Sequence, residues 1–178
     1  MVQYRDKNMP EYNIGFSKVL IDAANIIINI ENDDTLNSQR AALYLCKLSC
    51  EITLKASLEK AGRRIAEIRA YSHNLEALGN AVGKCEIEKE IMKGRPTWIS
   101  ASDFFGTEVD KRMVDVKTNA TIGTMLASEK HGSSKYPNEI RYGESIRDYP
   151  LELWLNTAKE LFSWADKNYD KIRLASKF

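Results

Sequence analysis

The sequence predicts an all-α fold, an antiparallel bundle of four to five main helices. Apolar residues recur at three- and four-residue spacing through several long segments, as on the buried face of a helix. No stretch of useful length alternates apolar and polar residues in the manner of a half-buried strand. The 178 residues also contain no internal repeat and no linker that would separate domains, so we expect one helical domain over residues 1–178.

The first two helices are predicted on either side of a polar break at residues 31–34. Pro10 suits the opening turn of the first helix, expected over residues 11–30, because a proline needs no hydrogen-bonded N–H there. The break ends in an aspartate, a residue that can cap the second helix by accepting its free N–H groups. The second helix should end at Ala61, since Gly62 readily adopts the left-handed conformation that stops a helix.

A third helix is predicted from a cap at Ser72 to about Met92, with Leu75, Leu78, Val82 and Cys85 on its buried side. The following Gly94-Arg95-Pro96 should end it, because proline disfavours helical geometry in the residue before it.

Residues 94–116 are expected to form a packed loop with a short helix beginning near Ser102 or Asp103. A partner-binding insertion is the alternative, and exposed aromatic side chains would favour it. The segment is too apolar for a disordered linker because it contains Trp98, Ile99, Phe104, Phe105, Val109 and Met113.

Two further helices are predicted in the remaining chain. One starts near Thr118 and ends before Gly132, and a turn-rich connection over residues 136–143 follows it. The last helix begins after Pro150 and should form the main wall of the core. Its apolar residues are Leu151, Trp154, Leu155, Ala158, Leu161, Phe162, Ala165, Tyr169 and Ile172.

Composition excludes several classes of protein. No run of about 18 apolar residues could cross a bilayer, and the N-terminus lacks the layout of a secretory signal, so a cytoplasmic location is expected. Cys46, Cys50 and Cys85 fit a reducing compartment, and with two histidines elsewhere they do not predict a metal site. A net charge of +1 provides no global attraction for nucleic acid.

Local charge is more informative between the second and third predicted helices. We call Arg63, Arg64 and Arg69 the basic elbow, because these three cations lie close to the expected turn. Such a patch can hold a phosphate. It can equally be a solvated helix end, since cations near a helix C-terminus complement the helix dipole.

Three pieces of the sequence together resemble the HEPN family of helical domains: a small-x-x-Glu-x-x-x-Lys-Ala helix, a His-x-Leu-x-x-Leu helix start and a late Arg-Tyr segment. The resemblance implies a helical bundle that binds a nucleotide or an RNA-related ligand, associates as a homodimer, and works beside a nucleotidyltransferase, an antitoxin or a defence system, without a cofactor. The matching positions are Glu51, Lys55 and Ala56, then His73, Leu75 and Leu78, then Ile140, Arg141 and Tyr142.

The candidate ligand-binding residues combine these positions with one residue of the basic elbow. An arginine can hold a phosphate and a tyrosine can stack on a base, while an imidazole exchanges protons near neutral pH. Each residue also has an ordinary structural role open to it, such as a helical ion pair or a loop anchor. The set is Glu51, Lys55, Arg69, His73, Arg141 and Tyr142.

A metal-independent endoribonuclease using His73 with Arg69 or Arg141 is a further hypothesis. Imidazole beside guanidinium is suited to attack by a ribose 2′-hydroxyl on a phosphate. Many HEPN ribonucleases carry Arg, four to six residues and then His late in the domain, whereas three residues separate Arg69 from His73 and the pair lies early. The sequence therefore favours a noncatalytic binding protein, and a dimeric adaptor is the third hypothesis.

Overall fold

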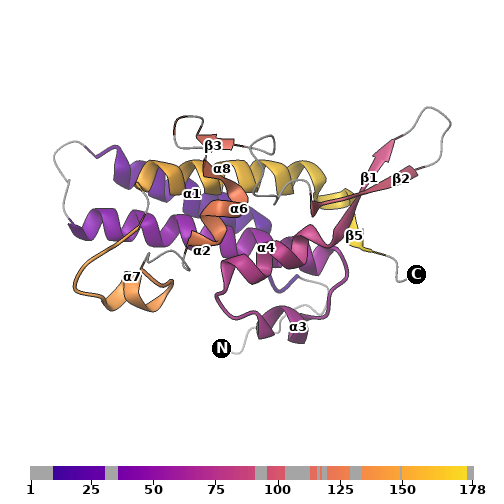
Figure 1. The fold of residues 1–178 in the computed structure, drawn as a ribbon, viewed down its shortest axis with the longest axis horizontal. Coiled ribbons are helices and arrows are strands. Elements are labelled where there is room, and N and C mark those ends of the chain that lie inside the picture. The colour runs from indigo at the N-terminus through magenta and orange to yellow at the C-terminus, as the bar shows by residue number, and fades with distance from the viewer. Residues whose placement is uncertain are drawn as a thin grey trace, which may run out of the picture.

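Three long helices form the body of the protein in the computed structural model, which describes residues 10–30, 36–90, 96–102, 113–115, 117, 120–128, 134–148 and 150–175. They are α1 (Ile14–Ile28), α2 (Leu36–Lys60) and α8 (Leu151–Asn168). Figure 1 shows the three side by side, with α1 antiparallel to the other two. These helices confirm that most of the chain is helical. Helix α2 lies at the centre of the body and packs against both α1 and α8.

The start of α1 differs from the prediction by one turn. Asn13 caps the helix by accepting a 2.8 Å hydrogen bond from the backbone N–H of Gly15, so Pro10 lies before the helix and not in its first turn. An asparagine oxygen satisfies a free N–H group directly, and this outweighs the tolerance of proline at a helix start. The buried residues of α1 are Ser17, Leu20, Ile21 and Ala24.

The end of α2 is as predicted. The helix stops at Lys60, and Gly62 has a φ of +96°, a left-handed conformation that glycine adopts without steric cost. The chain then turns into α3 (Ile65–Ala70) and α4 (Leu75–Gly83). Asn74 caps α4 through a bond from the N–H of Ala77, whereas the predicted cap Ser72 has a φ of +51° and lies in the turn.

The all-α prediction is wrong, because a three-stranded antiparallel sheet is built onto one end of the helical body. Its strands are β1 (Cys85–Glu90), β2 (Pro96–Ser100) and β5 (Ile172–Leu174), in the order β2-β1-β5. Ile87 pairs with Ile99 on one side and with Ile172 on the other. The fold is therefore mixed, mainly helical with a small sheet, and the β1–β2 hairpin projects beyond the helices (Figure 1).

The sheet explains two errors in the predicted helix lengths. The third helix ends at Gly83 instead of continuing to Met92, because residues from Cys85 onward pair with β2 and β5. The last helix ends at Asn168, followed by a 3-10 turn, η2 (Tyr169–Lys171), and then β5. Strand β5 has only three residues, and its partners in β1 lie 85 or more residues away, so this pairing determines β5 more than local propensity does.

The helix predicted from Thr118 is also shorter than expected. A second, two-stranded sheet joins β3 (Met113–Asp115) to β4 (Ala120–Thr121), and α6 (Ile122–Leu126) follows with Thr121 as its N-cap. Helix α7 (Asn138–Tyr142) occupies the connection predicted to be rich in turns. Strands β2 and β3 replace parts of the packed loop expected over residues 94–116. The short helix expected near Ser102 or Asp103 lies, from Asp103 onward, outside the described residues.

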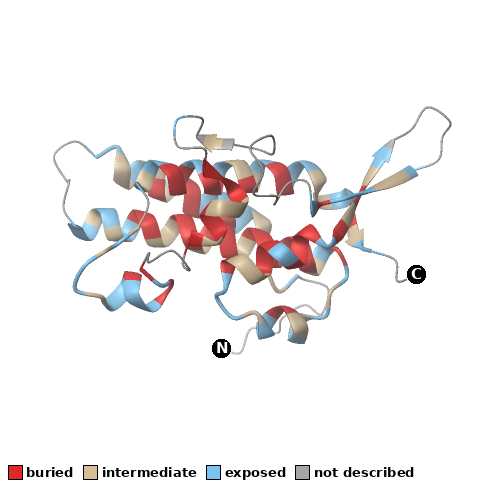
Figure 2. Ribbon diagram, viewed as in Figure 1, coloured by how far each residue is buried: buried red, intermediate tan, exposed pale blue. Residues whose placement is uncertain are grey.

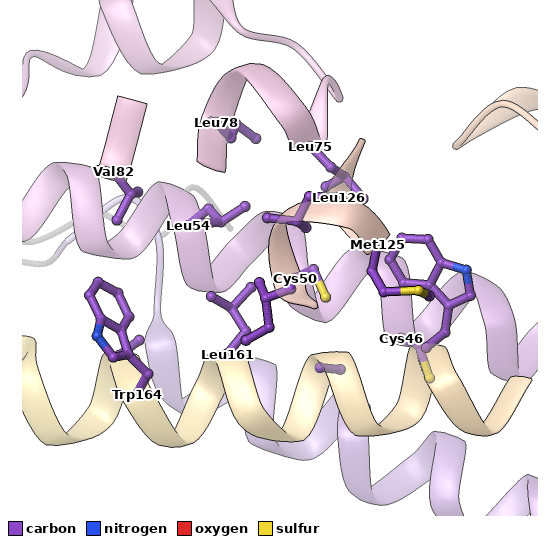
Figure 3. Packing of buried hydrophobic residues seen from close by; sticks show 14 of the residues in the cluster. Cys46, Cys50, Leu54, Leu75, Leu78, Val82, Met125, Leu126, Leu161 and Trp164 are labelled. Carbon is purple, nitrogen blue, oxygen red and sulfur yellow. The ribbon is translucent and has the colours of Figure 1, made fainter. Parts of the chain in front are cut away.

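The core lies where α4 and α6 close over α2 and α8. Figure 2 shows buried residues concentrated on the facing sides of these helices, and Figure 3 shows their side chains interlocking. Trp154 and Leu161 of α8 are fully buried, as are Leu54 and Leu58 of α2. None of the helices in the described part of the chain is long and apolar enough to cross a membrane.

Candidate functional site

Two predicted site residues, Glu51 and Lys55, form a buried ion pair in the middle of α2. Nζ of Lys55 lies 2.7 Å from Oε1 of Glu51, and the two side chains are 9% and 6% exposed. Removing a carboxylate and an ammonium group from water is costly unless the two are paired and hydrogen-bonded further. Burial thus distinguishes this pair from the surface ion pairs that the same spacing commonly produces.

His73 adds a third group to the pair. Its Nδ1 lies 2.9 Å from Oε2 of Glu51, so the carboxylate contacts Lys55 through one oxygen and His73 through the other. An ionised carboxylate only accepts hydrogen bonds, and Nδ1 therefore carries the proton in this contact. Nε2 is then an acceptor on the neutral ring and a donor on the imidazolium. The side chain is 49% exposed, which leaves the oriented ring accessible from solvent.

Tyr136 covers the histidine from the connection before α7. Its ring meets the His73 ring edge to face, with the centroids 5.8 Å apart and the planes at 86°. Burial, followed by the negative charge of Glu51 and a hydrogen bond with that carboxylate, raises the pKa of the Tyr136 hydroxyl. The phenol therefore stays protonated. We call Glu51, Lys55, His73 and Tyr136 the buried charge cluster.

Arg141 reaches the same region from α7 through a second tyrosine. Its guanidinium lies 4.7 Å from the ring centroid of Tyr44 and donates a hydrogen bond to the Tyr44 hydroxyl. Tyr44 in turn packs on Tyr136 with 5.6 Å between the ring centroids. The predicted Arg-Tyr segment and His73 are thus joined through two aromatic rings. Tyr142, the next residue, is 78% exposed and makes no such contact among the described residues.

A second buried ion pair fixes the connection that carries Tyr136 and Arg141. Nζ of Lys47 lies 2.5 Å from Oδ2 of Asp148, and the side chains are 0% and 1% exposed. The indole of Trp154 donates a 2.6 Å hydrogen bond to the other carboxylate oxygen, and the Lys47 ammonium lies 4.5 Å from its ring centroid. Lys47 also donates to the carbonyl of Ser134. Both ends of the connection are therefore held against α2 and α8.

Arg69 is placed differently from the prediction that pairs it with His73. Its guanidinium lies 2.7 Å from the carboxylate of Glu11, and this ion pair raises the pKa of Arg69. Glu59 binds the same N-terminal segment, accepting bonds from the backbone N–H groups of Glu11 and Tyr12. The Tyr12 ring then lies 5.5 Å from Nζ of Lys55. Arg69 therefore anchors the segment that closes over the Lys55 end of the buried charge cluster.

The rest of the basic elbow is largely neutralised. Arg63 and Arg64 both lie within ion-pair distance of Glu67, at 3.5 and 2.5 Å. Exposed pairs of this kind contribute little energy, but they remove the concentration of positive charge that would attract a phosphate. The elbow is better explained as a helix end with its counter-ions than as an anion-binding patch.

A cavity of 210 Å³ lies apart from the buried charge cluster, beside Asp148. It is lined by Leu36, Gln39, Leu43, Ile146, Asp148, Pro150 and Leu151. Both oxygens of Asp148 already bind Lys47 and Trp154, so this carboxylate is occupied by contacts within the protein. The candidate site is thus a surface around His73 and Arg141, distinct from this cavity.

Within the described part of the chain, no group of three or more histidine, cysteine or acidic residues could hold a metal ion. Cys46, Cys50 and Cys85 are buried free thiols. The expectation that the protein binds no metal remains a prediction.

Comparison with known proteins finds no matching family model, no similar curated protein and no similar solved structure. The resemblance to the HEPN family consequently stays a prediction based on the sequence motifs.

Three tyrosines of the site were not singled out from the sequence as contributors to it. Tyr44 precedes Glu51 by seven residues, which is two helical turns, so the spacing alone would have placed both on one face of α2. Tyr136 lies five residues before Arg141 in the turn-rich connection. Tyr12 comes from the N-terminal segment, and local sequence contains no sign that it reaches Lys55.

Proposed function

We propose that the protein binds a nucleotide or an RNA-related ligand at the surface formed by His73, Arg141 and Tyr142. The observation that supports this most is the hydrogen bond from Nδ1 of His73 to the buried carboxylate of Glu51. It orients a half-exposed imidazole, and burying a carboxylate and a lysine for this purpose is costly. A noncatalytic binding role in the cytoplasm, beside a nucleotidyltransferase or an antitoxin, agrees with the sequence resemblance.

The neighbouring groups match the chemistry of such a ligand. Arg141 has a planar guanidinium whose packing on Tyr44 limits its freedom, and arginine binds phosphate through paired hydrogen bonds. Tyr142 is the next residue and is 78% exposed, so its ring is accessible to a base that could stack on it. A protonated His73 supplies a second donor for a phosphate oxygen.

Thermal unfolding with nucleotides and short RNAs tests the proposal. A ligand at one hundred times its Kd stabilises the folded state by about 2.7 kcal/mol. We expect stabilisation of the natural protein, and a loss of it in Arg141→Ala and Tyr142→Ala. Arg64→Ala is the matched control, because Arg64 is an exposed arginine paired with Glu67 outside the site. No stabilisation at millimolar ligand, or equal losses in the control, would contradict the proposal.

A ribonuclease is the second candidate, favoured by the Glu51–His73 contact. A carboxylate that orients an imidazole is the usual partner of a general base. Arg141 would then hold the phosphate, because Arg69 is bound to Glu11. Cleavage of RNA in EDTA by the natural protein, lost in His73→Ala but kept in Arg64→Ala, would support this activity. Equal cleavage by the natural protein and His73→Ala, or none by either, would reject it.

A further inference from the structure

The outward side of α1 carries a row of apolar side chains that the fold leaves uncovered. We call this the outer row. Its spacing alternates between three and four residues, and three members are 47%, 58% and 63% exposed while Ala23 is half-buried. The members in chain order are Phe16, Val19, Ala23 and Ile26.

The outer row is separate from the face that α1 packs on its own core. The buried side of the helix consists of Ser17, Leu20, Ile21 and Ala24. Single exposed apolar residues are common on protein surfaces and need no explanation. A row that keeps the alternating three-four spacing over about three turns is the pattern of a helix-pairing seam, in which every member faces the same partner helix.

We propose that the outer row pairs with the outer row of a second copy of this chain, with the two α1 helices antiparallel about a two-fold axis near Ile21. The inference does not depend on the proposed ligand. It identifies an interaction surface for the homodimer that the sequence resemblance only implies.

Charge decides the antiparallel orientation. Lys18 and Asp22 border the outer row, are 56% and 57% exposed, and form a 2.8 Å ion pair within the helix. In a parallel pair, the side of one helix that carries Lys18 and Asp22 faces the opposite side of the second helix, so neither residue gains an ionic partner from its own copy. In the antiparallel pair, Lys18 of each copy lies within about 3 Å along the axis of the second copy's Asp22. The antiparallel pair therefore gains two attractive contacts between copies that the parallel pair lacks.

Side-chain size fits the same register. Phe16 of one copy meets Ile26 of the second copy, and Val19 meets Ala23. The large side chains therefore lie at the two ends, and the smaller pair lies beside the axis, where the backbones approach most closely. A row of side chains of equal size would not place the smaller ones beside the axis.

The size of the surface sets the expected strength. Two helices of 15 residues bury less than the roughly 1,200 Å² of a typical stable interface. The association should therefore depend on concentration in the micromolar range, and not form an obligate dimer.

Sedimentation velocity of the full chain from about 1 to 200 μM is the first test. We expect a monomer–dimer equilibrium whose Kd weakens at least tenfold in Val19→Glu and Ile26→Glu. These positions are exposed in the monomer, so circular dichroism should show an unchanged fold. Ile99→Glu is the matched control, because Ile99 is an exposed isoleucine of β2 at 41% exposure, far along the chain from α1, and it should leave the Kd unchanged.

A charge-exchange experiment tests the orientation. Lys18→Glu and Asp22→Lys should each weaken self-association, since each creates two repulsive contacts across the axis. An equimolar mixture should restore a heterodimer at least tenfold tighter than either variant alone, detected by native mass spectrometry. Neither variant keeps the ion pair within the helix, so the restoration reports contacts between copies.

Three results would overturn the proposal. The first is a natural protein that remains monomeric at 200 μM. The second is dimerisation unaffected by Val19→Glu and Ile26→Glu. The third is monomeric protein that floats with phosphatidylcholine–phosphatidylserine vesicles in a manner abolished by the same variants, which would assign the outer row to a lipid surface.

Discussion

Nδ1 of His73 and Oε2 of Glu51 lie 2.9 Å apart, although 22 residues separate them in the chain. The contact joins the turn before α4 to the middle of α2, and Glu51 holds Lys55 on its other oxygen. A single carboxylate thus supports one buried cation and one half-exposed imidazole. The position of His73, and with it the surface of the proposed site, depends on this one side chain.

Replacing Glu51 by glutamine should destabilise the fold strongly. The amide keeps the shape of the side chain but leaves Lys55 buried without its counter-charge, and removing one partner of a buried pair costs about 3–5 kcal/mol. Urea denaturation followed by circular dichroism measures the change. Asp22→Asn breaks the exposed pair with Lys18, so it should shift the free energy of unfolding by less than about 1 kcal/mol. Similar losses in the two variants would contradict the buried pair.

Lys47→Met should also destabilise the protein by about 3–5 kcal/mol, because the carboxylate of Asp148 would stay buried and charged without its counter-charge. Lys47→Met combined with Asp148→Leu should recover part of that loss, since an apolar pair leaves no buried charge. A double-mutant cycle in urea gives the coupling free energy between the two residues. Additive losses, with no coupling, would show that the contact contributes nothing.

The same Lys47 variant separates stability from ligand binding. The connection that bears Tyr136 and Arg141 is anchored through Asp148 and Ser134. Loosening this anchor should weaken the nucleotide-dependent stabilisation, even at a temperature where the variant is fully folded. A variant with normal ligand response would indicate that the connection is held adequately by its other contacts.

The sequence allowed the long helices to be predicted, most clearly α8, whose apolar spacing is strong over many turns. The stop at Gly62 was also predictable, since left-handed backbone is a local property of glycine. The buried pair of Glu51 and Lys55 followed from four-residue spacing, although its burial did not. Each of these features depends on neighbours within a few residues.

The sheet could not be predicted in the same way. Cys85 pairs with Leu174, 89 residues away, and β5 has three residues, too few for a recognisable alternating pattern. From Cys85 to Ile91 nearly every second residue is Cys or Ile and the others are charged, a strand-like alternation that the prediction of a longer helix overlooked. The contacts of Tyr12 and Tyr136 with the site are equally long-range, so chain topology and not local sequence determines them.

Gly62→Ala should cost about 1 kcal/mol through backbone strain alone. The glycine has a φ of +96°, and an added Cβ would meet nothing within 4 Å, so no steric clash contributes. Gly62→Asn should be less harmful, because asparagine tolerates left-handed backbone better than alanine. Thermal unfolding of the three proteins at neutral pH gives the order. If alanine proved as stable as glycine, the turn would have to adopt another conformation.

Alkaline pH should destabilise the fold through its buried acids. Burial raises the pKa of the Cys46 thiol from 9.0 to about 12 and that of Cys85 to about 11, and it also raises the pKa values of Cys50 and Tyr136. Above pH 9 the unfolded chain loses these protons while the folded chain keeps them. The folded state then binds more protons, so its stability decreases as pH rises.

The loss should begin near pH 9 and continue to about pH 12, with a slope of up to about 1.4 kcal/mol per pH unit for each buried thiol. Urea midpoints at pH 8, 9.5 and 11 measure it. Cys46→Ala should lower the stability at pH 8, because it leaves a small cavity, yet reduce the slope above pH 9. The native thiols should react slowly with a disulfide reagent at pH 8 and rapidly in urea. A stability that stays constant from pH 8 to 11 would mean that the three thiols are reached by water.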